Sequence, residues 1–279
     1  MSSIDVNYSD RPNKSLVRSR IFHIIEKAFH PEHKHSEKLS FITLSGYRFI
    51  DSIEFYHRFN IRNIYSIECK PKRYQRAWFN RPYEFIDITK GTIKDFIDEK
   101  YASVVETKKV IFLDYESRLI DDILSDLDAL FSSGFFKKKS LLFITFNRAF
   151  DLSKLTPKVK DILDDRIRAP EAFRTWLSEE FSNIVLNKLQ RKYGSSKKLT
   201  EVLKVFYCDT SNMVVFGYLI ADRRRGDVIR TIKTETFTLP ELTFLEANYI
   251  HNNLRLNPMD IANNLGLNVE DVRSYIQYS

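Results

Sequence analysis

Acidic side chains lie at the ends of three apolar segments of the sequence. Glu68 ends NIYSIE, Asp87 lies near the end of YEFIDI, and Asp114 is followed by Tyr115 at the end of KKVIFLDY. A carboxylate accepts hydrogen bonds from hydroxyl and amino groups, and its two oxygens can bind two hydroxyls at once. If these segments are parallel strands, their acids meet at the carboxyl edge of one sheet, where α/β proteins bind ligands. The alternative is that each acid only meets solvent at a strand end.

A short turn precedes the first of these acids. The stretch FITLSGYRF places Ser45 and Gly46 between an apolar run and a helix-like pattern. Glycine adopts positive φ at no steric cost and lets the backbone approach a ligand. Glu68 follows at about the 20-residue distance that separates the glycine turn from the ribose-binding acid in dinucleotide-binding folds. Bulky Tyr47 and Arg48 follow where such turns usually keep small residues.

Basic and aromatic residues alternate directly after Glu68. Residues 69–81 (CKPKRYQRAWFNR) combine five basic side chains with three aromatic ones. Cations bind phosphates and aromatic rings stack on bases, so this composition is typical of a nucleic-acid-binding surface. The candidate residues are Lys70, Lys72, Arg73, Arg76 and Trp78. The alternative, which we favour slightly on composition, packs the aromatic rings on the sheet and leaves the cations in water.

The composition describes a globular chain with a basic balance. The 279 residues are enough for one large domain, or for one domain plus a small appendage, and the 43% of hydrophobic residues is enough for a sizeable core. Lys and Arg number 44 against 37 Asp and Glu, and the net charge of +7 favours a nucleic acid as partner, or only a solvated basic surface. No run approaches the roughly 20 apolar residues of a membrane span. Without a signal-peptide core, we expect a cytoplasmic protein with two buried, reduced cysteines.

Strand-like and helix-like patterns alternate along the chain after a first helix at 15–29. The expected strands are 39–44, 63–69, 83–88, 108–115 and 140–146, with a hairpin over 202–222. The expected helices between them are 47–59, 71–80, 92–99, 119–131 and 169–193. This order predicts an α/β fold with a mostly parallel, Rossmann-like sheet, helices on both faces and a terminal antiparallel hairpin. We divide the chain into a Rossmann-like domain (1–222), a linker (223–236) and a small all-α unit (237–279).

The order of elements and the acids at strand ends resemble the class I S-adenosylmethionine-dependent methyltransferases over residues 39–222. The resemblance implies S-adenosylmethionine as cofactor and methyl transfer as activity. It implies that Ser45 and Gly46 face the methionine end of the cofactor, Glu68 the ribose hydroxyls and Asp87 the adenine side. The residues implied for catalysis or for contact with the acceptor are Asp114 and Tyr115. The stretch is not the Asp/Asn-Pro-Pro-Tyr/Phe box of enzymes that methylate amino groups of bases.

The last 43 residues predict three helices, at about 239–253, 258–265 and 269–277. NPMDIANNLGLNVEDVRSYIQ resembles a helix-turn-helix, with Gly266 at the turn between two helices. Residues 237–279 hold five acids and only two bases, so the unit carries −3 while residues 1–236 carry +10. Carboxylates at the start of a recognition helix would oppose phosphates. We therefore expect this unit to pack on the main domain or to bind a protein.

The sequence supports two functions of different classes. The first is methyl transfer from S-adenosylmethionine to a nucleic acid. The second is a Rossmann-like scaffold without catalysis, a binding subunit of a larger nucleic-acid-associated assembly, because the glycine turn is degenerate. Histidines near residue 30 lack the spacing of a zinc site, so we expect no metal. Serine-hydrolase and nucleotide-hydrolase motifs are absent from the sequence.

Overall fold

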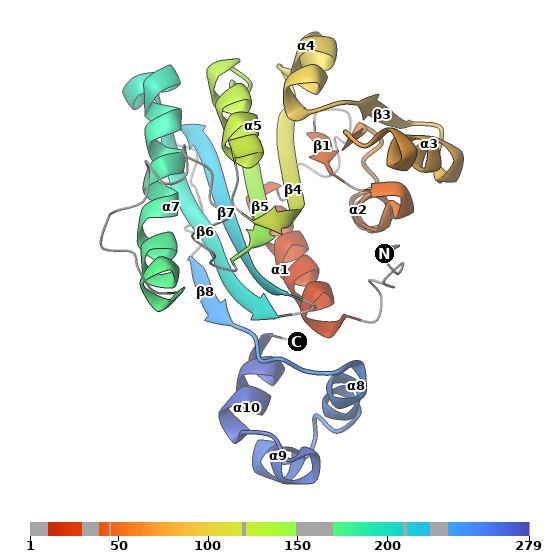
Figure 1. Cartoon of the computed structure of the whole chain (residues 1–279), viewed down its shortest axis with the longest axis vertical. Helices are drawn as coiled ribbons and strands as arrows, with labels where there is room; N and C mark the ends of the chain where they lie inside the picture. The colour runs from red at the N-terminus through yellow and green to blue at the C-terminus, as the bar shows by residue number, and fades with distance from the viewer. Residues whose placement is uncertain are drawn as a thin grey trace.

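A computed structural model describes residues 11–29, 39–44, 46–118, 121–148, 170–208, 211–223 and 234–278. In this part of the chain, eight strands form one sheet in the order β3-β2-β1-β4-β5-β7-β6-β8 (Figure 1). The strands are β1 (Leu39–Thr43), β2 (Ile64–Glu68), β3 (Ile86–Lys90), β4 (Lys108–Arg118), β5 (Ser140–Asn147), β6 (Lys197–Cys208), β7 (Asn212–Asp222) and β8 (Glu235–Thr238).

The sheet is parallel from β3 to β5, and β7 pairs antiparallel with both β5 and β6. This confirms the predicted mostly parallel sheet with a terminal hairpin. Several strand limits differ from the prediction. β6 begins at Lys197, five residues before the predicted hairpin, and β4 extends to Arg118 instead of residue 115. β3 begins at Ile86, three residues later than expected, and residues 235–236, predicted as linker, belong to β8, which pairs parallel with β6. The rest of the predicted linker up to residue 233 lies mainly outside the described residues.

Helices cover both faces of the sheet, as its apolar strands require, because residues pointing either way must be buried. One face holds α1 (Pro12–Phe29), α2 (Ile50–Phe59) and α3 (Pro71–Asn80), and the other holds α4 (Ile93–Val104), α5 (Asp121–Ser132) and α7 (Pro170–Tyr193) (Figure 1). Alternation along β4 shows the division: Val110 and Phe112 pack with the first group, Ile111 and Leu113 with the second. Short 3-10 helices are η3 (Gly46–Arg48) and η5 (Gly194–Ser196).

The C-terminal segment forms the three predicted helices, α8 (Phe244–Asn252), α9 (Pro258–Leu265) and α10 (Val269–Tyr278). Gly266 ends α9 with φ of 66°, in the left-handed conformation that favours glycine at this position. The apolar residues of this unit join the same buried cluster as α1. Asn13 of α1 donates to the carbonyl of Pro240 (2.7 Å), and the ring of Phe237 stacks on Tyr278 with 3.7 Å between centroids. The unit is thus fastened to the sheet and to α1, while its helix-turn-helix role and its protein partner stay predictions.

The cysteines correct one expectation. Neither forms a disulfide, but Cys69 is exposed and Cys208 half-buried, because Cys69 lies just beyond the end of β2 rather than within it. No described helix combines the length and apolar character needed to cross a membrane.

Candidate active site

The turn after β1 holds two residues in the left-handed conformation. Gly46 has φ of 59°, and Phe49, which precedes α2, has φ of 53° although it carries a bulky, fully buried side chain. Residues other than glycine rarely adopt this conformation, and such strain is concentrated at ligand sites. A Cβ at Gly46 would meet no atom within 4 Å, so the backbone angle and not crowding favours glycine. Ser45, predicted to share this role, lies outside the described residues.

Glu68 is the last residue of β2 and only 8% exposed. Its Oε1 accepts a hydrogen bond from the backbone N–H of Lys70 at 2.9 Å. The other carboxylate oxygen has no hydrogen-bond partner among the described residues. A buried carboxylate held by one oxygen, with the second available, suits the binding of a hydroxyl. The position agrees with the role that the sequence predicted, which the structure does not test.

A row of buried polar atoms crosses the sheet toward the carboxyl ends of β2, β1, β4 and β5. It consists of the hydroxyls of Ser66, Thr43 and Thr145 and of Asp114 Oδ1, and none of them has a hydrogen-bond partner in the described structure. Register and alternation place all four on the α1 side of the sheet, with Thr43 opposite Ser66 and Asp114 opposite Thr145. Buried polar groups without partners cost free energy, so a cluster of them indicates that a ligand or water completes their hydrogen bonds.

Asp114 forms an ion pair with a residue that the sequence analysis did not single out. Lys14 Nζ of α1 lies 2.6 Å from Asp114 Oδ2, and both side chains are nearly buried, at 12% and 11% exposure. The pair engages one oxygen of the carboxylate and leaves Oδ1 in the polar row. An ammonium held at 2.6 Å balances the carboxylate charge and fixes its orientation.

A second ion pair, one helical turn further along α1, supports the first. Arg18 Nε donates to Asp51 Oδ1 of α2 at 2.5 Å, and Glu54 Oε2 lies 3.7 Å away. Burial acts to lower the pKa of Arg18, but the charges of Asp51 and Glu54 outweigh it and the pKa is raised. Arg18 lies on the same stripe of α1 as Ile21, Ile25 and other apolar residues. A charge within an apolar stripe is a signal that could have revealed this buried network.

Two predicted site residues lie elsewhere. Tyr115 points to the other face of the sheet, because side chains alternate along β4, and its hydroxyl donates to Asp126 of α5 at 2.8 Å. Burial raises the pKa of Tyr115 well above its usual value. Asp87 is the second residue of β3, not its end, and pairs with Lys100 of α4 at 2.7 Å. The prediction that three acids share the carboxyl edge therefore holds for Glu68 and Asp114 but is wrong for Asp87.

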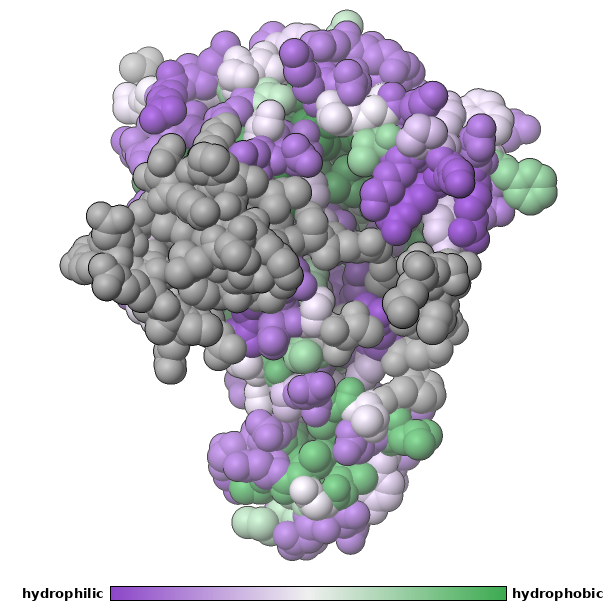
Figure 2. All heavy atoms as spheres, in the orientation of Figure 1, coloured by the Kyte–Doolittle hydropathy of each residue, from purple (hydrophilic) through white to green (hydrophobic). Residues whose placement is uncertain are grey.

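Trp78 and Phe79 of α3 do not pack on the sheet, contrary to the alternative that we favoured slightly on composition. Trp78 is 55% and Phe79 88% exposed, whereas Ala77 provides the buried contact with the core. Figure 2 shows a hydrophobic group projecting beside strongly hydrophilic ones in the α3 region. Guanidinium groups lie over aromatic rings here: Arg81 over Trp78 at 4.6 Å from the ring centroid and Arg76 over Tyr47 at 3.8 Å. Lys70 and Lys72 are exposed and Arg73 is half-buried.

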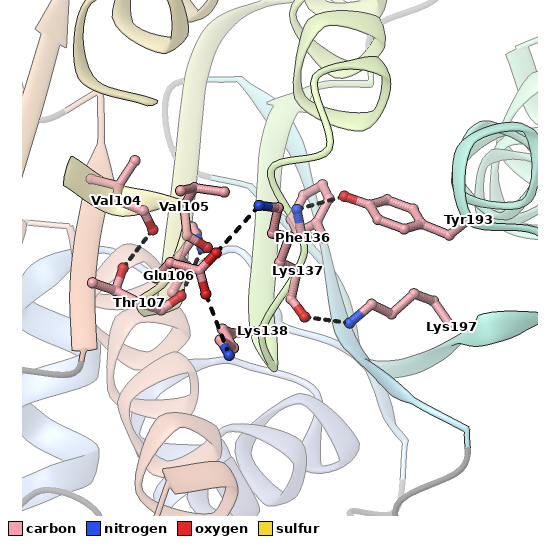
Figure 3. A network of polar contacts seen from close by, with 10 residues as sticks. Val104, Val105, Glu106, Thr107, Phe136, Lys137, Lys138, Tyr193 and Lys197 are labelled. Carbon is pink, nitrogen blue, oxygen red and sulfur yellow. Dashed lines mark hydrogen bonds and ion pairs between the residues drawn. The ribbon is translucent and has the colours of Figure 1, made fainter. Parts of the chain in front are cut away.

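At the opposite, amino edge of the sheet, three lysines form a network of polar contacts with Glu106 and backbone carbonyls (Figure 3). Lys137 and Lys138 pair with Glu106 at 3.3 and 3.4 Å, and Lys197 donates to the carbonyl of Lys137 at 2.7 Å. Lys109 is fully buried among these groups. This cluster is remote from the carboxyl edge, and we assign it a structural role.

Within the described ranges, no three His, Cys, Asp or Glu side chains come together as metal ligands. The histidines near residue 30 that the sequence analysis considered lie outside those ranges. The candidate site is therefore built from hydroxyl, carboxylate and ammonium groups.

The sheet order and the polar site at its carboxyl edge define an α/β protein with the class I methyltransferase fold. Residues 6–279 match the model of the family described as "Putative O-methyltransferase", and the chain belongs to that family. No curated protein matches the sequence.

Solved structures with similarity to this chain include three bound to the cofactor or its product. Trm1 from Pyrococcus horikoshii in complex with S-adenosyl-L-methionine has 11% identity and a TM-score of 0.49, covering 80% of this chain and 58% of its own. TrmK from M. capricolum with S-adenosyl-homocysteine has 12% identity and a TM-score of 0.38, covering 90% and 99%. A variant of LepI with SAH and a substrate analogue has 10% identity and a TM-score of 0.40, covering 71% and 46%. The chain thus spans about half the length of LepI and of Trm1, and likeness at this level carries no argument about ligand or substrate.

Proposed function

We propose that the protein transfers a methyl group from S-adenosylmethionine to a nucleic acid, and that the site lies at the carboxyl edge of β2, β1, β4 and β5. The observation that carries the proposal is the row of unpartnered buried polar atoms between Glu68 and Asp114. Membership of a methyltransferase family supports the reaction type. The basic balance of residues 1–236 and the exposed cations of α3 support an anionic acceptor.

The residues present fit this cofactor. The second carboxylate oxygen of Glu68 would accept a hydrogen bond from a ribose hydroxyl, and the turn with Ser45 and Gly46 would face the methionine part. Thr43 and Ser66 supply buried hydroxyls that need partners. S-Adenosylmethionine supplies a methyl group on a positively charged sulfur. Catalysis would then rest mostly on holding the acceptor in line with that methyl group.

Asp114 would act on the acceptor. Lys14 holds its Oδ2, so Oδ1 is oriented to accept a hydrogen bond from an acceptor hydroxyl and to take its proton as the methyl group is transferred. The family description names an oxygen acceptor. The internal hydroxyl that a nucleic acid offers is the ribose 2′-OH, which favours RNA over DNA.

A non-catalytic scaffold is the second candidate, and one observation favours it. Lys14 already neutralises the carboxylate of Asp114, as it would in an ion pair that only stabilises the fold. In that case the fold serves as a binding subunit, and Asp114→Asn would lower stability without changing any activity.

Calorimetric titration with S-adenosylmethionine tests the cofactor site. Glu68→Gln keeps the shape of the side chain and removes the charge. We expect it to weaken binding about 10- to 100-fold, the effect of losing one hydrogen bond to a charged group. Asp87→Asn is the matched control, because Asp87 lies away from the edge and should leave affinity unchanged. Absence of wild-type binding at millimolar ligand would refute the enzyme proposal and favour the scaffold.

Transfer of a radiolabelled methyl group tests the acceptor. We expect label in RNA and not in DNA of the same sequence, and its loss in Asp114→Asn with cofactor affinity retained. Equal labelling of both nucleic acids would refute the ribose 2′-OH as acceptor, and label found only in protein would refute a nucleic-acid acceptor.

A further inference from the structure

An exposed aromatic pair marks the outer side of α3. Trp78 and Phe79 are adjacent in the helix and present large apolar surfaces to solvent, at 55% and 88% exposure. Exposed large aromatic side chains are costly in water and often mark interaction sites. Most aromatic residues elsewhere in the described chain are buried or half-buried, including the other tryptophan, Trp176 at 9% exposure.

The charged residues next to this pair in the sequence have one sign. Residues 70–82 contain five basic residues and no acid. Arg81 already lies over the Trp78 ring, and Lys70, Lys72 and Arg81 form no ion pair with a described residue. An apolar protein partner would have to desolvate these cations, whereas a polyanion would pair with them.

The surface also lies next to the candidate active site. Only Cys69 and Lys70 separate Glu68 from the first residue of α3. Tyr47 connects the two regions: it belongs to η3 after β1, its ring lies under Arg76, and its carbonyl accepts from Asn80 of α3 at 3.4 Å. A polymer held on α3 would reach the carboxyl edge without crossing the core.

We infer that this surface, formed by Trp78 and Phe79 with Arg81, binds unpaired nucleotides of the RNA acceptor by stacking bases on the aromatic rings. Flat aromatic groups beside cations bind single strands because every base has a stacking face, and bases within a duplex cannot reach them. The inference rests on the proposed function for the choice of RNA, and it adds that the acceptor site lies in a single-stranded segment.

Fluorescence of Trp78 reports stacking directly. The chain has two tryptophans, so Trp176→Phe leaves Trp78 as the only one. We expect a single-stranded oligouridine of about 12 nucleotides, within the usual size of a single-strand binding site, to quench this fluorescence in a saturable way at low salt, and a duplex of equal length to have little effect. Since Trp176 is buried and its replacement can lower stability, fluorescence anisotropy of labelled oligouridine with the wild-type tryptophans is the second measurement.

Variants separate stacking from charge. By anisotropy, Trp78→Ala should weaken binding about 5- to 100-fold, the effect of losing one stacked base, and Trp78→Tyr should restore much of it. Leu245→Ala is the matched control, because Leu245 of α8 is also exposed, at 77%, but far from basic residues in sequence. The inference would be overturned if heparin quenched the fluorescence as much as oligouridine does, or if duplex and single strand bound with equal affinity. It would also be overturned if Trp78→Ala and Leu245→Ala lost equal affinity for oligouridine.

Titration of the same variants with S-adenosylmethionine distinguishes the two proposals. If Trp78→Ala binds the cofactor normally but not oligouridine, the inference stands together with the proposed function. If the wild type binds oligouridine through Trp78 but no cofactor, the proposed methyl transfer fails and the stacking surface stands as part of a binding subunit. Absence of oligouridine binding with normal cofactor binding overturns the stacking surface alone.

Discussion

Lys109 gives the structure a measurable dependence of stability on pH. Its ammonium is buried at the start of β4, donates to the carbonyls of Val105 (3.2 Å) and Thr107 (2.7 Å), and lies 5.0 Å from the centroid of the Phe135 ring. Burial lowers the pKa of Lys109 to about 7. Glu106 acts in the opposite direction, and Lys197, Lys138 and Lys137 lower it further.

The sign of the effect follows from proton binding. Between pH 7 and about 10.5 the unfolded chain keeps the proton on Lys109 while the folded chain has lost it. The free energy of unfolding therefore rises with pH in this window, by up to about 1.4 kcal/mol per pH unit. From about pH 7 to about pH 9.5 the contribution of this group amounts to about 3 kcal/mol.

Lys109→Met removes this contribution and keeps a side chain of similar length. Urea unfolding at about pH 7, 8 and 9.5 should show the difference in unfolding free energy between wild type and variant shifting by about 3 kcal/mol in favour of the wild type. Lys198→Met, which removes an exposed lysine of β6, is the control. A wild-type-to-variant difference that is the same at all three pH values would refute the buried ammonium as its source.

Three further predictions concern contacts that stabilise the fold: an ion pair, a close approach of two strands and a stacked pair of rings. Asp51→Asn should lower the unfolding free energy by about 3 kcal/mol, because it leaves the buried guanidinium of Arg18 with only the more distant and more exposed carboxylate of Glu54; a loss below about 1 kcal/mol in urea unfolding would contradict this. Gly217→Ala should cost about 1–3 kcal/mol and lower Tm, since its Cβ would lie 2.8 Å from an aromatic ring of β5, and an unchanged Tm would show that the sheet adjusts freely. Tyr278→Ala removes the ring stacked on Phe237, so limited proteolysis should cut within 237–278 faster than in wild type, and equal rates would show that the stack does not hold the unit.

Much of the fold could be predicted, because the spacing of apolar residues and the residue types at turns depend only on neighbouring positions in the sequence. Near-continuous apolar runs identified the parallel strands, and Gly266 identified the turn between the last two helices. The short β8 was missed, because Phe237 is the only apolar residue among its four, and so short and polar a segment gives no strand pattern in the sequence. It forms a strand by pairing with the edge of β6. The limits of β3 were misplaced for a related reason: Tyr83 and Phe85 are apolar but pack outside the strand as stacked rings.

The candidate site was only partly predictable. Glu68 could be found from its spacing after Gly46, since the turn after β1, the helix α2 and the strand β2 form one short contiguous unit of the chain. Lys14 could not, because its partner Asp114 is 100 positions away and only tertiary structure brings α1 to the end of β4. The exposure of Trp78 was also not predictable from composition, which cannot tell a packed ring from a free one.

The position of α1 has a consequence for how the chain reaches this structure. This helix is synthesised before every strand of the sheet, yet it packs on β6, and Asn13 donates to the carbonyl of Cys208, 195 residues later. At about 5–20 residues per second, this partner is synthesised roughly 10–40 seconds after the helix. Until then the apolar stripe of α1 has no β6 to cover it, so the nascent chain presents a binding site for chaperones, and folding cannot be completed in the order of synthesis.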